Sequence, residues 1–230
     1  MCGSLPSSFD RLRMTFPLRH VNPPPDRLST VKYNIFLPKL PQCFFYMTPE
    51  TKPVRILAIS GSLKAGSVNT ALLHQMSAFA HSPVRYRIYE ALEGLPPFNP
   101  DHETGNTAVK EFKELLREAD GLLISTPEYA FGLPGVLKNA LDWTVHSGDL
   151  NHKPVAVISA SPLPTGGDKA MASLLLTLGA LGTRTEPGMT LSIPAILKKT
   201  DADKRITEDE TMGSLQQLFE RLLTCIRPNG

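Results

Sequence analysis

The chain is short of the residues that would mark it as a secreted, membrane-spanning or nucleic-acid-binding protein. Its 230 residues contain three cysteines, Cys2, Cys43 and Cys225, which are far apart and in no metal-ligand spacing. That usage favours reduced thiols in a cytoplasmic protein. The formal net charge is only +2, without the clustered basic face that a nucleic-acid partner needs. No apolar run approaches the roughly 20 residues that cross a bilayer, so we expect no membrane partner.

Several enzyme signatures are absent as well. The six histidines are scattered, with no HExxH motif and no carboxylates at ligand spacing, so we predict no metal. There is no G-x-S-x-G nucleophile elbow, which makes a hydrolase a distant alternative. No catalytic triad and no paired carboxylates are visible, and we predict no catalytic acid or base.

Residues 1–52 differ from the rest of the chain because they are rich in proline and show no sustained period of 2 or 3.6. Prolines at this density interrupt helices and strand ladders. The segment also lacks the basic start and apolar core of a signal peptide. We interpret it either as a disordered extension or as sequence upstream of a translation start at Met47. The folded domain is predicted to span residues 53–230.

From residue 53 onward, apolar runs of strand length alternate with amphipathic stripes of helical spacing. We predict five strands, each followed by a helix, at residues 54–60, 84–89, 121–125, 154–160 and 189–193. The second run alternates apolar and arginine residues, as expected for a half-exposed edge strand. Pro134 is expected to be the first residue of the third helix.

This alternation indicates a three-layer α/β sandwich around a five-stranded parallel sheet. Right-handed crossovers and short connections leave few possible strand orders. We predict the flavodoxin-like order 2-1-3-4-5, without an internal repeat or a second folded domain. That order places a ligand at the carboxyl ends of strands 1, 3 and 4.

The first predicted strand runs into a small polar loop, GSLKAGSVN at residues 61–69. Two glycines let the backbone turn tightly and approach an anion, and the following helix offers free N–H groups and a positive dipole end. The polar donors of the loop are Ser62, Lys64, Ser67 and Asn69. These features suit a phosphate monoester, with a plain glycine–serine turn as the alternative. The Walker lysine and the third glycine of a dinucleotide fingerprint are missing, which disfavours a nucleoside triphosphate or a Rossmann site.

Two further polar loops follow the third and fourth strands. The loop at residues 125–135, STPEYAFGLPG, holds the aromatic pair Tyr129 and Phe131 beside small residues. Aromatics and free amides at a strand's carboxyl end suit a flat heteroaromatic ring. Packing on the next helix is the alternative, stronger for Phe131 than for Tyr129. The loop at residues 159–167, SASPLPTGG, again carries glycines and hydroxyls, and the fold brings all three loops together.

These residues resemble a known family, the NAD(P)H-dependent FMN reductases, which include quinone, chromate and azo-dye reductases. The family pattern GSL-[RK]-x-x-S-x-N matches at residues 61–69, and T-P-E-Y-N-x-S-x-P-G-x-L-K-N-A-x-D-W matches closely at residues 126–143. The resemblance implies non-covalent FMN, with its phosphate held by Ser62, Lys64, Ser67 and Asn69. It also implies that the isoalloxazine ring is lined by Pro127, Glu128, Tyr129 and Ala130, with Ser161 near it.

The resemblance implies an FMN-dependent NAD(P)H oxidoreductase that works by a hydride relay through the bound flavin. Its acceptors would be flavins, quinones or similar small molecules, including chromate or azo compounds. The flavin does the difficult chemistry while the protein orients it. A non-enzymatic flavodoxin-like electron carrier is the alternative, but such carriers are strongly acidic and this chain is near neutral. A degenerate flavodoxin fold used only for binding is opposed by the intact first loop.

Members of the family form dimers or tetramers, so the resemblance implies that this chain is a homodimer or homotetramer. Phe131, Trp143 and the helix at residues 136–146 are predicted to belong to the interface, because they are apolar beyond the core stripe. For Trp143, ordinary core packing is an equal alternative.

Three departures from the family pattern bear on the site. Ala130 replaces the usual asparagine, which preserves a contact through the backbone N–H but not one through an amide side chain. Lys64 replaces the usual arginine, so the loop offers an ammonium point charge instead of a guanidinium that can bind a phosphate through two N–H groups. Asp168 stands where a basic residue is common, which leaves the choice between NADH and NADPH open.

Overall fold

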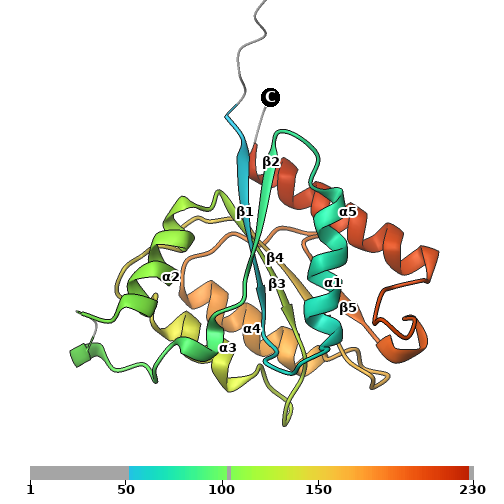
Figure 1. Ribbon diagram of the computed structural model, residues 1–230, viewed down its shortest axis with the longest axis horizontal. Helices are drawn as coiled ribbons and strands as arrows, with labels where there is room; N and C mark the ends of the chain where they lie inside the picture. Colours follow the sequence, from blue (N-terminus) through green and yellow to red (C-terminus); the bar gives the residue numbers. More distant parts are fainter. Residues whose placement is uncertain (1–51, 103–104, 228–230) are drawn as a thin grey trace, which may run out of the picture. The chain divides into compact units, whose positions relative to one another are not determined.

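A five-stranded parallel sheet in the order β2-β1-β3-β4-β5 forms the frame of the computed structural model (Figure 1). Its strands are β1 (Val54–Ser60), β2 (Val84–Tyr89), β3 (Gly121–Thr126), β4 (Val155–Ala160) and β5 (Thr190–Ile193). The structure describes residues 52–102 and 105–227, so the predicted N-terminal extension, apart from its last residue, lies outside the described residues. The predicted strand order and flavodoxin-like fold are confirmed.

Burial differs between the centre and the edge of the sheet. β3 and β4 are buried along their whole length because helices cover both faces. Edge strand β2 instead alternates half-buried and exposed residues, with Arg85 and Arg87 exposed. This is the half-exposed edge that the alternating sequence predicts. Charged side chains on an open edge hinder pairing with other chains.

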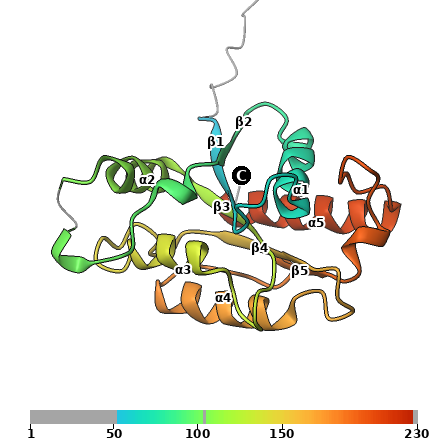
Figure 2. The ribbon, with the colours of Figure 1, turned by 60° about the horizontal axis from the view of Figure 1, so that its bottom comes forward.

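Five helices form the two outer layers (Figures 1 and 2). One layer contains α1 (Val68–Met76) and α5 (Asp209–Ile226); the other contains α2 (Thr107–Glu118), α3 (Gly135–Asp142) and α4 (Asp168–Ala180). None of the helices in the described part of the chain has both the length and the apolar character needed to cross a membrane.

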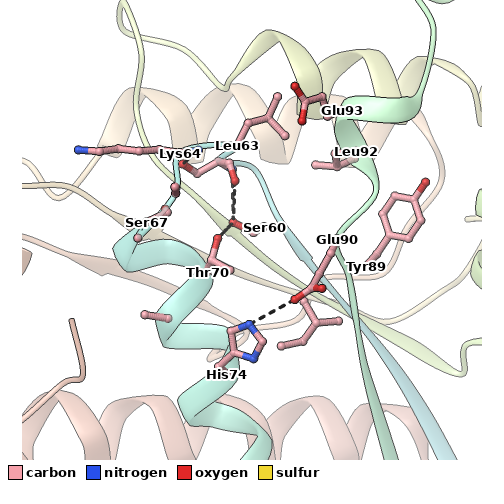
Figure 3. Close-up of a pocket in the computed structure, with 15 residues that line it drawn as sticks. Ser60, Leu63, Lys64, Ser67, Thr70, His74, Tyr89, Glu90, Leu92 and Glu93 are labelled. Atoms are coloured by element: carbon pink, nitrogen blue, oxygen red, sulfur yellow. Dashed lines mark hydrogen bonds and ion pairs between the residues drawn. The ribbon is translucent and has the colours of Figure 1, made fainter. Parts of the chain in front are cut away.

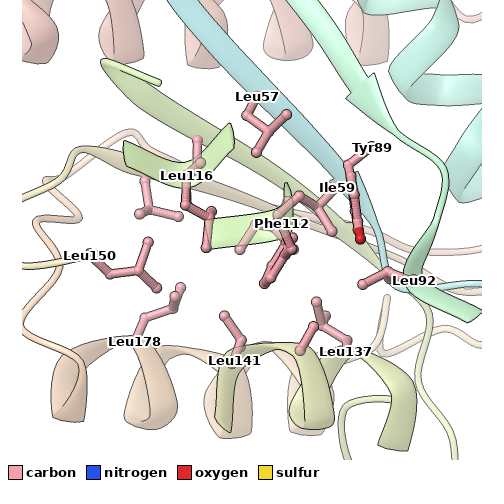
Figure 4. Close-up of a cluster of buried hydrophobic side chains, with 14 of the residues drawn as sticks. Leu57, Ile59, Tyr89, Leu92, Phe112, Leu116, Leu137, Leu141, Leu150 and Leu178 are labelled. Carbon is pink, nitrogen blue, oxygen red and sulfur yellow. The ribbon is translucent and has the colours of Figure 1, made fainter. Parts of the chain in front are cut away.

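Two apolar cores lie between the sheet and these layers, because successive strand residues face opposite sides. On β1, Ile56 belongs to the core under α1 and α5, whereas Leu57 belongs to the core under α2, α3 and α4. Figure 4 shows the latter, where Phe112 of α2 and Leu141 of α3 point toward the sheet. Burying such a side chain contributes about 1.5–3 kcal/mol, so both layers hold the sheet firmly beneath its loops.

The third helix differs from its prediction at both ends. Pro134 is the N-cap of α3 rather than its first residue, because its ψ of 139° is extended. Its carbonyl accepts the first N–H groups, those of Leu137 and Lys138. The helix ends at Asp142, so only the first part of the predicted stretch 136–146 is helical and turns follow it.

The carboxyl ends of β1, β3 and β4 are aligned, and the three polar loops start there. Ser60 pairs with Ser125 across β1 and β3, and Thr126 pairs with Ser159 across β3 and β4. Parallel strands send their following loops out at the same edge, where ligands bind in open α/β sheets. The sheet register therefore positions the candidate site.

Candidate functional site

The loops after β1, β3 and β4 start from adjacent strand ends. They are called the first, second and third loops: residues 61–67, 127–134 and 161–167. The Gly61 N–H donates to the Ser125 carbonyl at 2.8 Å. A Cβ on Gly61 would lie 3.0 Å from Thr126 Oγ1 and 3.1 Å from Leu137 Cδ2. This position therefore needs glycine because the end of β3 and the side chain of Leu137 on α3 approach so closely.

The first loop closes on itself through its own polar groups. The Ser67 N–H donates to the Lys64 carbonyl at 3.0 Å, and the Lys64 N–H donates to Ser62 Oγ at 3.3 Å. Gly66 has a φ of 67°, in the left-handed region that glycine enters without steric cost. Ser62 and Ser67 are buried, whereas Lys64 is exposed. The loop is thus held in one shape with its single cation facing solvent.

Helix α1 begins with unpaired donors. Ser67 occupies its N-cap position, but the serine side chain makes no capping hydrogen bond. The first helical bond to the cap runs from the Ala71 N–H to the Ser67 carbonyl at 2.9 Å. The N–H groups of residues 68–70 precede it and have no intrahelical acceptor. Together with the helix dipole and the Lys64 ammonium, this donor set suits a phosphate monoester.

The Asn69 side chain bonds to two neighbouring strands. Its Oδ1 accepts from Ser125 Oγ at 2.8 Å, and its Nδ2 donates to the Ala160 carbonyl at 3.4 Å. Both Asn69 and Ser125 are buried. The side-chain amide, predicted as a donor to phosphate, therefore has partners inside the protein, while the Asn69 backbone N–H stays at the helix N-terminus.

A cavity of about 390 Å³ lies beside the first loop, on the side of β2 (Figure 3). Its walls come from β1, the first loop, α1 and the segment that includes and follows the end of β2, and none of them from the second or third loop. The Ser60 and Thr70 hydroxyls form a 2.8 Å hydrogen bond in its wall. Burial, assisted by the nearby Glu111 carboxylate, raises the pKa of Tyr89, so this lining hydroxyl stays protonated.

The tip of the second loop is a two-residue hairpin turn. Tyr129 and Gly132 exchange two N–H to carbonyl hydrogen bonds, of 3.1 and 3.0 Å. Between them Ala130 and Phe131 have φ values of 47° and 58°, as a type I′ turn requires. This conformation costs roughly 1–2 kcal/mol per non-glycine residue. Within the described part of the chain, the Ala130 and Phe131 N–H groups have no hydrogen-bond partner, so they are free to donate to a ligand.

The aromatic residues predicted around this loop separate into exposed and buried ones. Tyr129 is 53% exposed and Phe131 is 79% exposed, so the alternative that Phe131 packs on the next helix does not hold. Trp143 is only 1% exposed; its Nε1 donates to the Pro96 carbonyl at 2.9 Å, and its ring packs edge-on against Phe98. Core packing therefore describes Trp143, and the prediction that it lies at a subunit surface is wrong because its ring is buried within the chain.

Glu128 connects the second loop to the helix that follows the third loop. The loop begins at the half-buried Pro127, and the next residue turns its carboxylate toward α4. One Glu128 oxygen accepts the N–H groups of Lys169 and Ala170 at 2.9 and 3.0 Å. Negative charge is favourable at such a helix N-terminus. Gly167, with a φ of 82°, lies where a Cβ would be 3.6 Å from the Glu128 Cβ.

Ser161 is fixed by the protein in a similar way. Its Oγ accepts the Leu163 N–H at 3.2 Å, and its own N–H donates to the Ile193 carbonyl at 3.2 Å. Gly166 adopts a φ of 65°, and a Cβ there would lie 3.0 Å from the Pro194 nitrogen. The third loop is thus packed on the segment after β5, with Ser161 buried at its base.

Sequence reasoning missed four residues that shape the site: Ser60, Thr70, Ser125 and Ala160. Ser60 and Ser125 carried a signal, because each is a hydroxyl at the carboxyl end of an otherwise apolar strand. Nothing in the sequence marks Ala160, whose contribution is a backbone carbonyl. Its bond to Asn69 joins residues 91 positions apart, and the Ser125 bond joins residues 56 apart.

Comparison with known proteins agrees with this geometry. Residues 54–197, which contain all three loops, match the family model for NADPH-dependent FMN reductase. The chain is 32% identical over 178 residues to an NAD(P)H-dependent FMN reductase from Pseudomonas aeruginosa, covering 76% of this chain and 96% of that protein. It is 30% identical over 178 residues to a 2-hydroxy-1,4-benzoquinone reductase from a Burkholderia species, covering 76% and 97%.

A solved structure with the same fold is also similar in sequence. The flavoenzyme NAD(P)H:(acceptor) oxidoreductase from Paracoccus denitrificans has a TM-score of 0.69 and 27% identity, covering 77% of this chain and 99% of that one. Its fold agrees with the sheet order, and the family match spans the phosphate-type loop and the TPEY loop. The chain therefore belongs to the NADPH-dependent FMN reductase family and is a flavin-dependent NAD(P)H oxidoreductase.

Proposed function

We propose that the chain binds FMN across its three loops, oxidises NAD(P)H and reduces a quinone or another small acceptor. The observation that carries this proposal is a pair of donor sets at adjacent strand ends. The uncapped N-terminus of α1 suits a phosphate, and the unpaired N–H groups of Ala130 and Phe131 suit the polar edge of a ring. A Cβ on Gly66 would meet no atom within 4 Å, so no protein atom blocks the approach to the first loop at this position.

At the phosphate end, each predicted residue has a specific role. The Ser67 hydroxyl and the first amides of α1, including that of Asn69, donate to the phosphate oxygens. The Lys64 ammonium offsets part of the negative charge from the solvent side. Ser62 accepts the Lys64 N–H and so keeps the loop in its binding shape.

At the ring end, the second loop supplies most of the surface. Pro127, Glu128, Tyr129 and Ala130 line the ring, and Ser161 approaches it from the third loop. When bound, FMN supplies the hydride relay between NAD(P)H and the acceptor. The Ala130 N–H donates to the ring without an asparagine side chain, while the Glu128 carboxylate holds the loop against α4. The exposed hairpin tip leaves one side accessible to the two substrates in turn.

Quinones are the acceptors that the relatives support best. A Burkholderia relative is a 2-hydroxy-1,4-benzoquinone reductase, and an Arabidopsis thaliana relative at 30% identity over 178 residues is an NADPH:quinone oxidoreductase. Free flavins, chromate and azo compounds are further candidate acceptors. Initial rates with each acceptor, measured with NADH and with NADPH, rank them directly.

We also infer a cytoplasmic homodimer or homotetramer. Phe131 and Val145, 79% and 54% exposed, are large apolar side chains before and after α3, and exposed apolar side chains are common in surfaces that bind another copy. Cys225 is a free, buried thiol, which suits a reducing compartment. Sedimentation of the purified protein tests the assembly, and a monomer at all concentrations would contradict it.

The visible spectrum of the purified protein tests the proposed function. We expect a yellow protein, or a colourless one that turns yellow with added FMN and retains it through gel filtration. Anaerobic addition of NADPH or NADH should bleach the flavin band, and a quinone should restore it. A protein that cannot retain FMN would refute the proposal.

A further inference from the structure

Three buried groups meet between the first turn of α1 and the ends of β3 and β4. Asn69 Oδ1 accepts from the Ser125 hydroxyl at 2.8 Å, and Asn69 Nδ2 donates to the Ala160 carbonyl at 3.4 Å. The exposed fraction is 4% for Asn69 and 0% for Ser125. None of the three residues lines the cavity of Figure 3. They lie at the base of the loops.

The partners determine how the Asn69 amide is oriented. A carbonyl only accepts hydrogen bonds, so the Ala160 oxygen faces the amide NH2 group. Ser125 then donates its hydroxyl proton to the amide oxygen. Turning the amide toward a ligand would leave the buried Ser125 hydroxyl without an acceptor, which is unfavourable.

These two hydrogen bonds connect the bases of all three loops. Asn69 follows the first loop by two residues, Ser125 precedes the second loop by two, and Ala160 precedes the third loop by one. A single side chain of α1 therefore bonds to both β3 and β4, beside the point between β1 and β3 where the order of the sheet reverses. The phosphate and the ring of FMN belong to one molecule, so loops that bind both must keep a fixed separation.

Resting on the proposed function, we propose that the Asn69 side chain is a positioning group that sets the spacing between the phosphate loop and the two ring loops. In this role its oxygen and one Nδ2 hydrogen are bonded inside the protein, and the Asn69 backbone N–H, rather than the other Nδ2 hydrogen, is assigned to the anion. Ser125 acts in the same device, although it is completely buried and touches no ligand.

Comparison of FMN with riboflavin tests this role, since riboflavin carries the ring without the phosphate. Asn69→Ala and Ser125→Ala are each expected to weaken binding of both flavins by a similar factor, about 10-fold for a lost buried hydrogen bond. The matched control is Ser67→Ala, which removes a hydroxyl from the phosphate loop itself. It should weaken FMN binding several-fold and leave riboflavin binding unchanged. Quenching of flavin fluorescence gives each dissociation constant.

A second readout uses FMN alone at saturating concentration. The visible band of bound FMN should shift in Asn69→Ala and in Ser125→Ala, because the ring loops move, but not in Ser67→Ala. The double variant Asn69→Ala/Ser125→Ala should be no worse than Asn69→Ala, because Ser125→Ala removes a bond already lost. Circular dichroism checks the fold, and Ser125→Ala carries the test if Asn69→Ala does not fold.

Two results would overturn the positioning role. One is an Asn69→Ala variant that loses FMN affinity while riboflavin affinity and the bound spectrum stay unchanged, which would make the amide a phosphate ligand. The other is a Ser125→Ala variant indistinguishable from the unaltered protein in affinity and spectrum. A wild-type chain that binds neither flavin is a different outcome, because it overturns the proposed function itself.

Discussion

The first loop buries its hydroxyls and closes on itself, whereas the second loop exposes aromatic side chains on a strained turn. In the first, Ser62 and Ser67 are buried and Gly66 provides the left-handed conformation. In the second, alanine and phenylalanine adopt that conformation, at positions 130 and 131, without the freedom of glycine. A phosphate is held by fixed N–H groups and needs a rigid loop. A ring that two substrates must reach needs an open face, and strain is commonly stored at such functional positions.

The largest effect is expected from a substitution that gives the first loop a side-chain cap for helix α1. Ser67→Asp places a carboxylate at the N-cap of α1, where it can accept the free N–H groups and interact with the helix dipole. We expect the ligand-free protein to gain about 1 kcal/mol of stability. FMN affinity should fall by about 100-fold, because the carboxylate takes the phosphate's donors and repels its charge.

Thermal denaturation and flavin titration measure these opposite effects. The control is Ser67→Asn, which caps the helix without adding charge and should cost less affinity than the aspartate. Unchanged FMN binding by Ser67→Asp would show that the phosphate lies elsewhere.

The second loop should respond to a change that leaves the first loop untouched. Glu128→Ala removes the acceptor of two N–H groups at the start of α4. We expect the free energy of unfolding to fall by about 1–2 kcal/mol, since bonds to a charged acceptor are stronger than neutral ones. Urea denaturation provides the measurement, and Glu128→Gln, which keeps an acceptor oxygen, should lose less. Equal stability of Glu128→Ala and the unaltered chain would mean that the loop is held by other contacts.

The smallest effect is expected at the hairpin tip. Phe131→Gly relieves the left-handed strain at a φ of 58° and should raise stability by about 1 kcal/mol. If Phe131 lies at the proposed interface, the same change shifts sedimentation toward smaller species. Leu176→Ala is the matched control, because Leu176 is equally exposed but lies on α4, away from the hairpin. A gain in stability without any shift in sedimentation would remove Phe131 from the interface.

The sheet was predictable because its signals are local. Buried parallel strands appear as apolar runs, and β1 and β2 have the bounds that were predicted. The general handedness and shortness of crossovers left few possible strand orders, and the order 2-1-3-4-5 chosen among them is the one in the structure. The start of α3 was displaced by one residue, because the fixed φ of Pro134 suits an N-cap as well as a first helical position, and only ψ, which is extended here, distinguishes the two.

The candidate site was predictable in its composition but not in its hydrogen bonding. The loops were located by glycines and hydroxyls at strand ends, which are visible in the sequence. The partners of Asn69 lie 56 and 91 residues away, so only the folded sheet brings them into reach. The burial of Trp143 could not be predicted from the sequence either, since it depends on contacts with Pro96 and Phe98, which are more than 40 residues away in the chain.

If the uncapped start of α1 holds the FMN phosphate as proposed, flavin binding becomes a competition. Its free N–H groups and the Lys64 ammonium attract any small oxyanion, so inorganic phosphate or sulfate opposes FMN by mass action. Apparent FMN affinity will therefore depend on the buffer anion, and a phosphate buffer will make the same protein look like a weaker flavin binder. With the phosphate site as proposed, the pool of free phosphate inside a cell would set how much FMN is needed to keep this enzyme loaded.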